Sequence, residues 1–204
     1  KKIVKTTLKD ALEGRGFIVN PTLWDYYNSG DGSSFRRTNP EEKCNQWQQW
    51  MINEVPYSKI PTSVADSFKS YGDVALITLS RSGGEYSDLH YNYTASTDSI
   101  GNNDNGNAES KSADGGYLGL SDEEEELFTQ VAALKKQGVF SKVVLLLNTG
   151  NPLQMQDIEK YYSSLDACLW IGQPGSTGIN AVADLLRGKD NDGNSLSPSG
   201  RLPD

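Results

Sequence analysis

The carboxyl group best placed for catalysis is that of Glu85, in a polar loop that follows an apolar run. The run covers residues 74–79, and the loop, residues 80–88, reads Ser-Arg-Ser-Gly-Gly-Glu-Tyr-Ser-Asp. The two glycines allow backbone shapes that other residues resist, so they place Glu85 on a flexible but anchored arm. A carboxyl delivered in this way acts as a general acid when burial under a partner domain raises its pKa. Most loop glutamates are simply solvated, and the local pattern leaves that interpretation open.

Three other segments resemble ion-binding loops. Residues 172–178 precede an expected helix, where an anion can bind, but they lack both the Gly-Lys-Ser/Thr of a phosphate loop and the dinucleotide fingerprint. Residues 190–194 start like a calcium loop without its final glutamate, and residues 102–107 are a similar Asn/Gly tract. We interpret the first segment as a tight strand-to-helix turn and the other two as plain turns. Asn92 begins a glycosylation sequon, a pattern that also arises by chance.

Histidine and cysteine are too scarce for most catalytic triads and metal sites. His90 is the only histidine, so a Ser-His-Asp triad within this chain would depend on it alone. Cys44 and Cys168 are far apart and lack CxxC spacing. This favours two reduced thiols in a reducing compartment over a disulfide, although the disulfide stays open. We therefore expect no cofactor, no metal and a cytoplasmic location.

The composition indicates a folded, acidic domain. The 204 residues are enough for one domain with a core, and four Trp and ten Tyr favour packed structure over disorder. The net charge of −8 disfavours nucleic acid and anionic membranes, because phosphate binding needs a basic stripe. The longest apolar stretch, residues 143–147, is far too short to span a membrane, and no signal peptide opens the chain.

Apolar runs alternate with amphipathic segments in the order typical of a parallel sheet. Nearly continuous apolar sequence predicts buried strands over residues 74–79, 142–148 and 167–171. Helices are predicted over residues 7–16, 23–27, 61–70, 121–138, 152–163 and 179–187. The alternation predicts an α/β fold, a three-layer α/β/α sandwich with a mostly parallel central sheet. Functional groups are then expected in the loops past the strands' carboxyl ends, after residues 79, 147 and 171.

The strongest helix start signal is at Ser121, which forms a capping box with Glu124. The acidic run of residues 123–126 lies in the first turn, where the helix dipole favours negative charge. We interpret this run as a solvated helix face rather than an acid cluster for a metal.

Six segments together resemble the C-terminal-type domain of glycoside hydrolase family 3, the family of many β-glucosidases. The strongest piece is Trp-Ile-Gly-Gln-Pro-Gly-Ser-Thr-Gly at residues 170–178, with Ser-Gly-Arg-Leu-Pro at residues 199–203. The matching segments are residues 71–85, 118–124, 143–152, 170–178, 181–188 and 198–203. Their order and spacing make the resemblance specific.

The resemblance implies a retaining exo-glycosidase that acts on β-linked glucosides or oligosaccharides. In this family a (β/α)8 barrel supplies the Asp nucleophile, and the α/β sandwich supplies the acid/base carboxyl and part of the sugar pocket. It implies Glu85 as the acid/base residue, with Glu109 as the runner-up because this residue varies in position across the family. Arg81 and Asp88 would contact the sugar or brace the loop, and bracing is the favoured interpretation.

The sequence departs from the family pattern in three places. Tyr86 stands where relatives commonly carry glycine, and residues 190–196 form an insertion before the closing motif. The Gln-Pro-Gly variant resembles relatives in which the sandwich precedes the barrel. We expect residues 1–204 to form one sandwich domain that begins after its first strand, is inactive alone, and has the barrel of the same polypeptide as its partner. The alternative is a stand-alone carbohydrate-binding or scaffold module.

Overall fold

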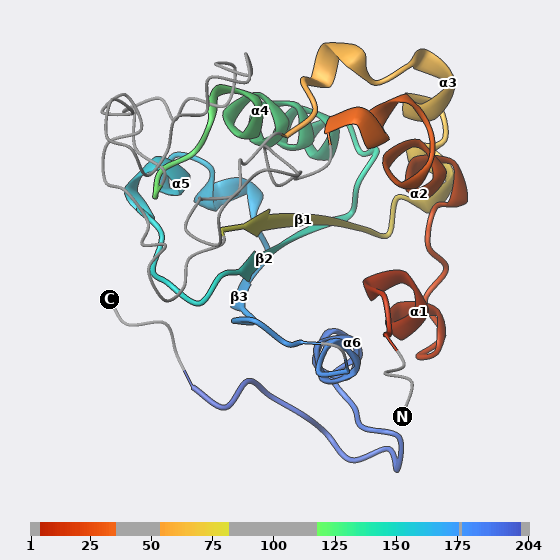
Figure 1. Cartoon of the computed structure of the whole chain (residues 1–204), viewed down its shortest axis with the longest axis vertical. Helices are drawn as coiled ribbons and strands as arrows, with labels where there is room; N and C mark the ends of the chain where they lie inside the picture. Colours follow the sequence, from red (N-terminus) through yellow and green to blue (C-terminus); the bar gives the residue numbers. More distant parts are fainter. Residues whose placement is uncertain (1–4, 36–53, 82–117, 176, 201–204) are drawn as a thin grey trace, which may run out of the picture.

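A three-stranded parallel sheet lies at the centre of the molecule (Figure 1). The computed structural model describes residues 5–35, 54–81, 118–175 and 177–200. The strands lie side by side in the order β1 (Val74–Ser80), β2 (Lys142–Asn148) and β3 (Ala167–Trp170). Their register pairs Ser80 with Asn148, and Leu147 with Trp170, so the three carboxyl ends meet at one edge of the sheet. The predicted parallel sheet is confirmed.

Helices cover both faces of this sheet, as Figure 1 shows. On one face lie α1 (Leu8–Glu13) and α6 (Ile179–Arg187), and on the other lie α4 (Asp122–Lys136) and α5 (Gln156–Glu159). The shorter peripheral elements are α2 (Pro21–Asn28), α3 (Thr62–Ala65) and the 3-10 helices η1 (Asp31–Phe35), η2 (Tyr57–Lys59), η3 (Phe68–Tyr71) and η5 (Tyr162–Ser164). The predicted three-layer α/β arrangement is therefore confirmed.

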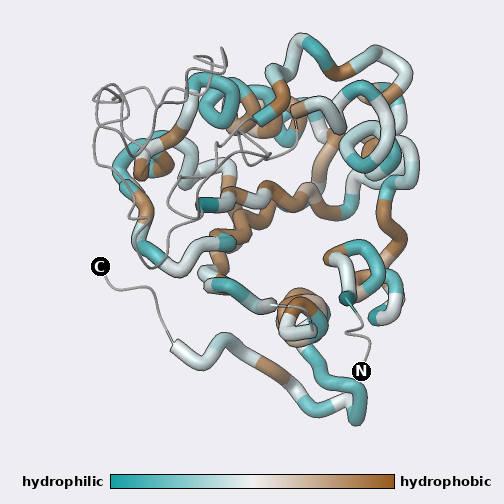
Figure 2. The backbone as a smooth tube through the Cα atoms, viewed as in Figure 1, coloured by the Kyte–Doolittle hydropathy of each residue, from teal (hydrophilic) through white to brown (hydrophobic). Residues whose placement is uncertain are grey.

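Strand β2 forms the middle of the core, and the apolar colour in Figure 2 is concentrated along the strands. Its residues 143–147 are all buried. Successive side chains point to opposite faces, so Leu145 packs with Phe128 of α4 and Leu146 packs with Val182 of α6. Because both faces are covered, the strand has no solvent-facing side, which explains its unbroken apolar sequence.

The predicted helix over residues 152–163 is wrong in extent, because the structure has only the short α5 followed by η5. The backbone N–H of Gln154 donates to the carbonyl of Leu118 at 2.9 Å. That bond ties the segment to the chain entering α4 instead of to its own helix. The helix begins only at Gln156, without a side-chain cap. In the part of the chain that the structure describes, no helix combines the length and hydropathy needed to cross a membrane.

Candidate active site

The carboxyl edge of the sheet brings three polar strand ends together. Ser80 ends β1 and Asn148 ends β2, and the Asn148 Nδ2 donates to the Ser80 Oγ at 3.0 Å. Trp170 ends β3 beside them. Ligands of open parallel sheets bind outside this edge, so these residues define the candidate site.

Arg81, the first residue after β1, is a buried anchor four residues before Glu85 in the sequence. Its side chain makes a bidentate ion pair with Glu124, with Nη1 to Oε1 at 2.8 Å and Nη2 to Oε2 at 2.7 Å. The guanidinium also donates to the carbonyls of Gly119 at 2.6 Å and Ser80 at 3.0 Å. Only 2% of Arg81 is exposed. This geometry is that of a side chain that braces the backbone.

Glu124 has two functions in the structure. The predicted capping box is confirmed: the Ser121 Oγ accepts from the N–H of Glu124, and the Glu124 Oε2 accepts from the N–H of Ser121 at 3.0 Å. The expectation that residues 123–126 form a solvated face is wrong for Glu124, which is 2% exposed. The capping position turns its carboxylate toward the end of β1, where Arg81 neutralises the charge.

Trp170 is held in place by the turn after β2. Its indole Nε1 donates to the carbonyl of Thr149 at 2.5 Å. Thr149 is itself buried, and its hydroxyl both donates to the carbonyl of Asn151 and accepts from the N–H of that residue. The turn is thus internally bonded, and it fixes one edge of the indole. The rest of the ring is open to solvent, with 46% of the residue exposed.

Glu54 is a buried carboxyl that sequence reasoning did not single out. Its Oε1 accepts from the N–H of Val55 at 2.9 Å and from the Tyr27 hydroxyl at 3.3 Å. Desolvation, with a smaller contribution from the negative charges of Glu124 and Glu123, raises the pKa of Glu54 to about 7. The same burial raises the pKa of Tyr27 far above its ordinary value. No motif marks this glutamate, because its burial depends on the packing of distant segments.

Of the three segments interpreted as turns, the two that lie within the described residues adopt turn geometry. In residues 172–178 the N–H of Gly178 donates to the carbonyl of Pro174 at 3.0 Å, and Gly172 and Gly175 have positive φ. In residues 190–194 the Asp190 carboxylate accepts from the N–H groups of Asp192 and Asn194 and from the Asn194 amide. Backbone donors therefore occupy the carboxylate that would otherwise be available to a cation.

Metal ligands do not gather among residues 5–35, 54–81, 118–175 and 177–200, where no group of three or more His, Cys, Asp or Glu side chains could hold an ion. Cys168 is a half-buried free thiol. The predicted site residues Glu85, Asp88 and Glu109 lie outside the described residues. Their assignments remain predictions, as do those for His90, Cys44, Asn92 and residues 102–107, which also lie there.

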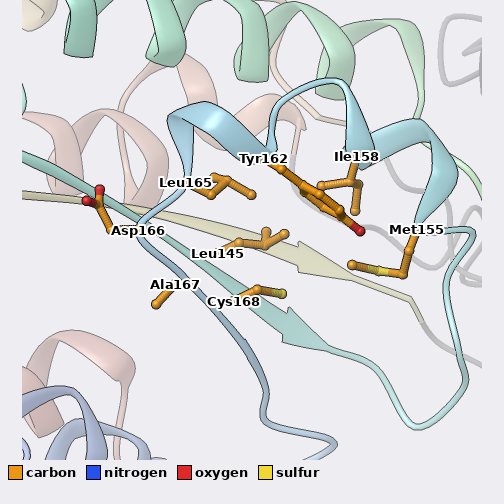
Figure 3. A pocket seen from close by; sticks show the side chains of 8 residues that line it. All are labelled: Leu145, Met155, Ile158, Tyr162, Leu165, Asp166, Ala167 and Cys168. Atoms are coloured by element: carbon orange, nitrogen blue, oxygen red, sulfur yellow. The ribbon is translucent and has the colours of Figure 1, made fainter. Parts of the chain in front are cut away.

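A small cavity lies under α5 and η5, against β2 and the start of β3 (Figure 3). Its volume is about 190 Å³, and apolar side chains such as those of Met155, Ile158 and Leu165 reach into it toward the strands. The carboxylate on its rim, Asp166, accepts from Lys135 Nζ at 2.6 Å and from the N–H of Val143 at 2.7 Å. Ligand pockets are usually larger and offer polar groups that point inward, so this cavity is a poor substrate site.

Comparison with known proteins points to one enzyme family. Residues 18–204 match the model of the glycosyl hydrolase family 3 C-terminal domain. A "Beta-glucosidase" of Ruminococcus albus is 38% identical over 44% of the chain, and a "Probable beta-D-xylosidase 6" of Arabidopsis thaliana is 34% identical over 42%. A "Beta-xylosidase/alpha-L-arabinofuranosidase 1" of Medicago sativa subsp. varia is 30% identical over 47%. These matches span 8%, 10% and 11% of the respective relatives.

Proposed function

Because the chain belongs to glycosyl hydrolase family 3 and carries its C-terminal domain, we propose that it is the α/β part of a retaining exo-glycosidase. The substrate is a β-linked glucoside or oligosaccharide. Glu85 is the acid/base residue, and a barrel domain of the same polypeptide supplies the Asp nucleophile. The isolated chain, lacking that nucleophile, is inactive.

The observation that supports this proposal best is the buried anchor at Arg81. An acid/base carboxyl must be held close to the scissile bond, and a loop does this only when its ends are fixed. Glu85 follows Arg81 by four residues, so chain geometry limits the separation of their Cα atoms to roughly 14 Å. The bonds of Arg81 to Glu124, Gly119 and Ser80 fix the near end of that loop at the carboxyl edge.

In the proposed reaction the two carboxyl groups act on opposite sides of the sugar. The protonated Glu85 gives its proton to the glycosidic oxygen while the barrel Asp attacks the anomeric carbon, so that the leaving alcohol departs and a glycosyl-enzyme ester forms. Ionised Glu85 then takes a proton from water, and the resulting hydroxide displaces the Asp. Retention of configuration requires the two carboxyls to lie about 5 Å apart.

Arg81 acts in this proposal as a positioning residue, since its guanidinium is already bound to protein oxygens. Asp88 contributes either to sugar binding or to bracing of the same loop. Glu109 is the alternative acid/base residue. Mutation of each glutamate in turn distinguishes the two assignments.

The test compares Glu85→Gln with the matched variant Glu109→Gln in the full-length protein. Proton donation matters most for poor leaving groups, so Glu85→Gln should lower kcat/KM for an alkyl glucoside or disaccharide at least about a hundredfold. The kcat/KM for a dinitrophenyl glycoside, which reports the glycosylation step, should fall much less, because this leaving group needs no proton. Glu109→Gln should stay near the wild type on both substrates. The reverse pattern would transfer the role to Glu109, and small equal losses in both variants would reject both assignments.

A further inference from the structure

Trp170 is exposed at the place in the fold where ligands of parallel sheets bind. Residues with large exposed apolar side chains in the described part of the chain are Ile18, Val74, Tyr162, Trp170 and Leu196. Within this set only Trp170 ends a strand at the carboxyl edge, because Val74 begins β1 at the opposite end. Indole surface is unfavourable in water, so the open face of this Trp at the carboxyl edge is available to a ligand that covers it.

The indole is held ready for a ligand. Its N–H is bound to the carbonyl of Thr149, and Thr149 is buried and bonded to Asn151. The one polar atom of the side chain is therefore satisfied within the protein, and the open remainder of the ring is apolar. A ring whose position is already fixed loses little conformational freedom when another group stacks on it.

The polar groups at this edge of the sheet favour a neutral ligand with hydroxyl groups. Asn148 and Ser80, which end the neighbouring strands, are neutral, and their amide and hydroxyl are bonded to each other. The Gln173 side chain lies against Gly150, next to the turn that holds the indole. Arg81, the cation at this edge, is buried against Glu124, so an anionic ligand gains little from its charge. A sugar ring combines an apolar C–H face with a hydroxyl rim, which matches an apolar platform with the neutral amide of Gln173 next to the turn that holds it.

We propose that Trp170 is a stacking platform for a pyranose ring of the substrate, one unit or more away from the bond that is cleaved. This inference rests on the proposed glycosidase function. Glu85 follows β1, whereas Trp170 ends β3, and two strand spacings separate these strands by roughly 10 Å. The platform therefore acts on chain-length preference and leaves the chemical step unchanged.

The experiment measures kcat and KM of the full-length protein on an aryl monoglycoside and on cello- and xylo-oligosaccharides of two to four units. Tyr162→Ala is the matched control, because Tyr162 is 47% exposed but lies in η5, away from the carboxyl edge. Trp170→Ala should raise KM for the longer oligosaccharides about tenfold, corresponding to loss of one stacking contact. The kcat and KM values of Trp170→Ala for the aryl monoglycoside should stay within about twofold of wild type, as expected if only the stacking contact is lost. Trp170→Phe keeps an aromatic ring and should recover part of the loss.

Two results would overturn the platform. Equal losses on the monoglycoside and the oligosaccharides would mean that Trp170 is only structural, and unchanged kinetics would mean that it touches no substrate. If the wild-type protein hydrolyses no glycoside at all, the proposed function fails separately. The platform is then judged by titrating the full-length protein with cellotetraose and xylotetraose. A fluorescence change that is present in wild type and absent in Trp170→Phe supports it, and identical responses reject it.

Discussion

Arg81 and Glu124 form a bidentate ion pair that joins the end of β1 to the first turn of α4, with both side chains withdrawn from water. The pair spans 43 residues of sequence. It fixes the start of one loop and the start of one helix with the same contact. The carboxylate also caps α4 through Ser121, so helix formation and loop anchoring depend on each other.

Breaking this pair should destabilise the fold. Arg81→Met leaves the Glu124 charge buried and uncompensated, and should lower the free energy of unfolding by roughly 3–5 kcal/mol. The double variant Arg81→Met/Glu124→Gln should recover part of that loss, because glutamine is neutral and still accepts the Ser121 N–H. Urea-induced unfolding measures the free energy of unfolding of the single and the double variant. The exposed pair of Lys9 and Glu13 is the control, since Lys9→Gln should leave the unfolding midpoint in urea almost unchanged. A loss below about 1 kcal/mol for Arg81→Met would contradict this account.

Arg81→Lys in the full-length protein separates bracing from sugar contact. Lysine keeps the charge but cannot make the bidentate bonds to Glu124. As a brace, Arg81 is needed to place the proposed acid/base residue, so kcat on substrates with poor leaving groups should fall about tenfold or more with little change in KM. Steady-state kinetics on a disaccharide and a dinitrophenyl glycoside measure this. A large rise in KM with unchanged kcat on both substrates would instead favour direct contact with the sugar.

Glu54 should make stability fall as the pH rises from about 4.5 to about 7. The pKa of its carboxyl is raised from 4.5 to about 7 in the folded protein, so over this range the folded chain binds the proton more tightly than the unfolded chain. The stabilisation is fully present below pH 4.5 and is lost through pH 7, amounting to roughly 3 kcal/mol. Urea unfolding at half-unit pH steps checks this.

Glu54→Gln is the control for this pH dependence. Glutamine keeps an acceptor for the N–H of Val55 and the hydroxyl of Tyr27, but it does not titrate. The variant should therefore lose the downward slope between pH 5 and 7, and it should be more stable than wild type at pH 8. If stability depends on pH in the same way in the wild type and in Glu54→Gln, this carboxyl is not the source of the pH dependence.

Gly72 is expected to resist any side chain. A Cβ at this position would lie 2.1 Å from the carbonyl oxygen of Val139, and the Gly72 carbonyl accepts from the N–H of Ser141 at 2.7 Å. Gly72→Ala must therefore separate the start of β1 from the segment entering β2, which should cost more than roughly 2 kcal/mol. Gly200→Ala, with open space around it, is the control and should stay within about 0.5 kcal/mol of wild type in thermal unfolding. Equal effects of the two variants would contradict the close approach.

Local signals in the sequence were sufficient for most of the architecture. Continuous apolar runs predicted β1, β2 and β3 because a strand covered on both faces has no polar side. The capping box of Ser121 and Glu124 predicted the start of α4, because the partners lie three residues apart and bond within one turn. The segment after Asn151 was missed, since the contact of Gln154 with Leu118 that interrupts its helix joins residues far apart in sequence.

The sequence by itself determined that this chain is an α/β domain of a glycoside hydrolase family, because periodicity, caps and motif order are properties of neighbouring residues. It also predicted functional groups in the loops past the strand ends. Only the tertiary structure decided that Arg81 is paired with Glu124, that Glu54 is desolvated beside Tyr27, and that the indole N–H of Trp170 is bound to Thr149. Burial and partner choice depend on segments that meet only after folding, so no local pattern encodes them.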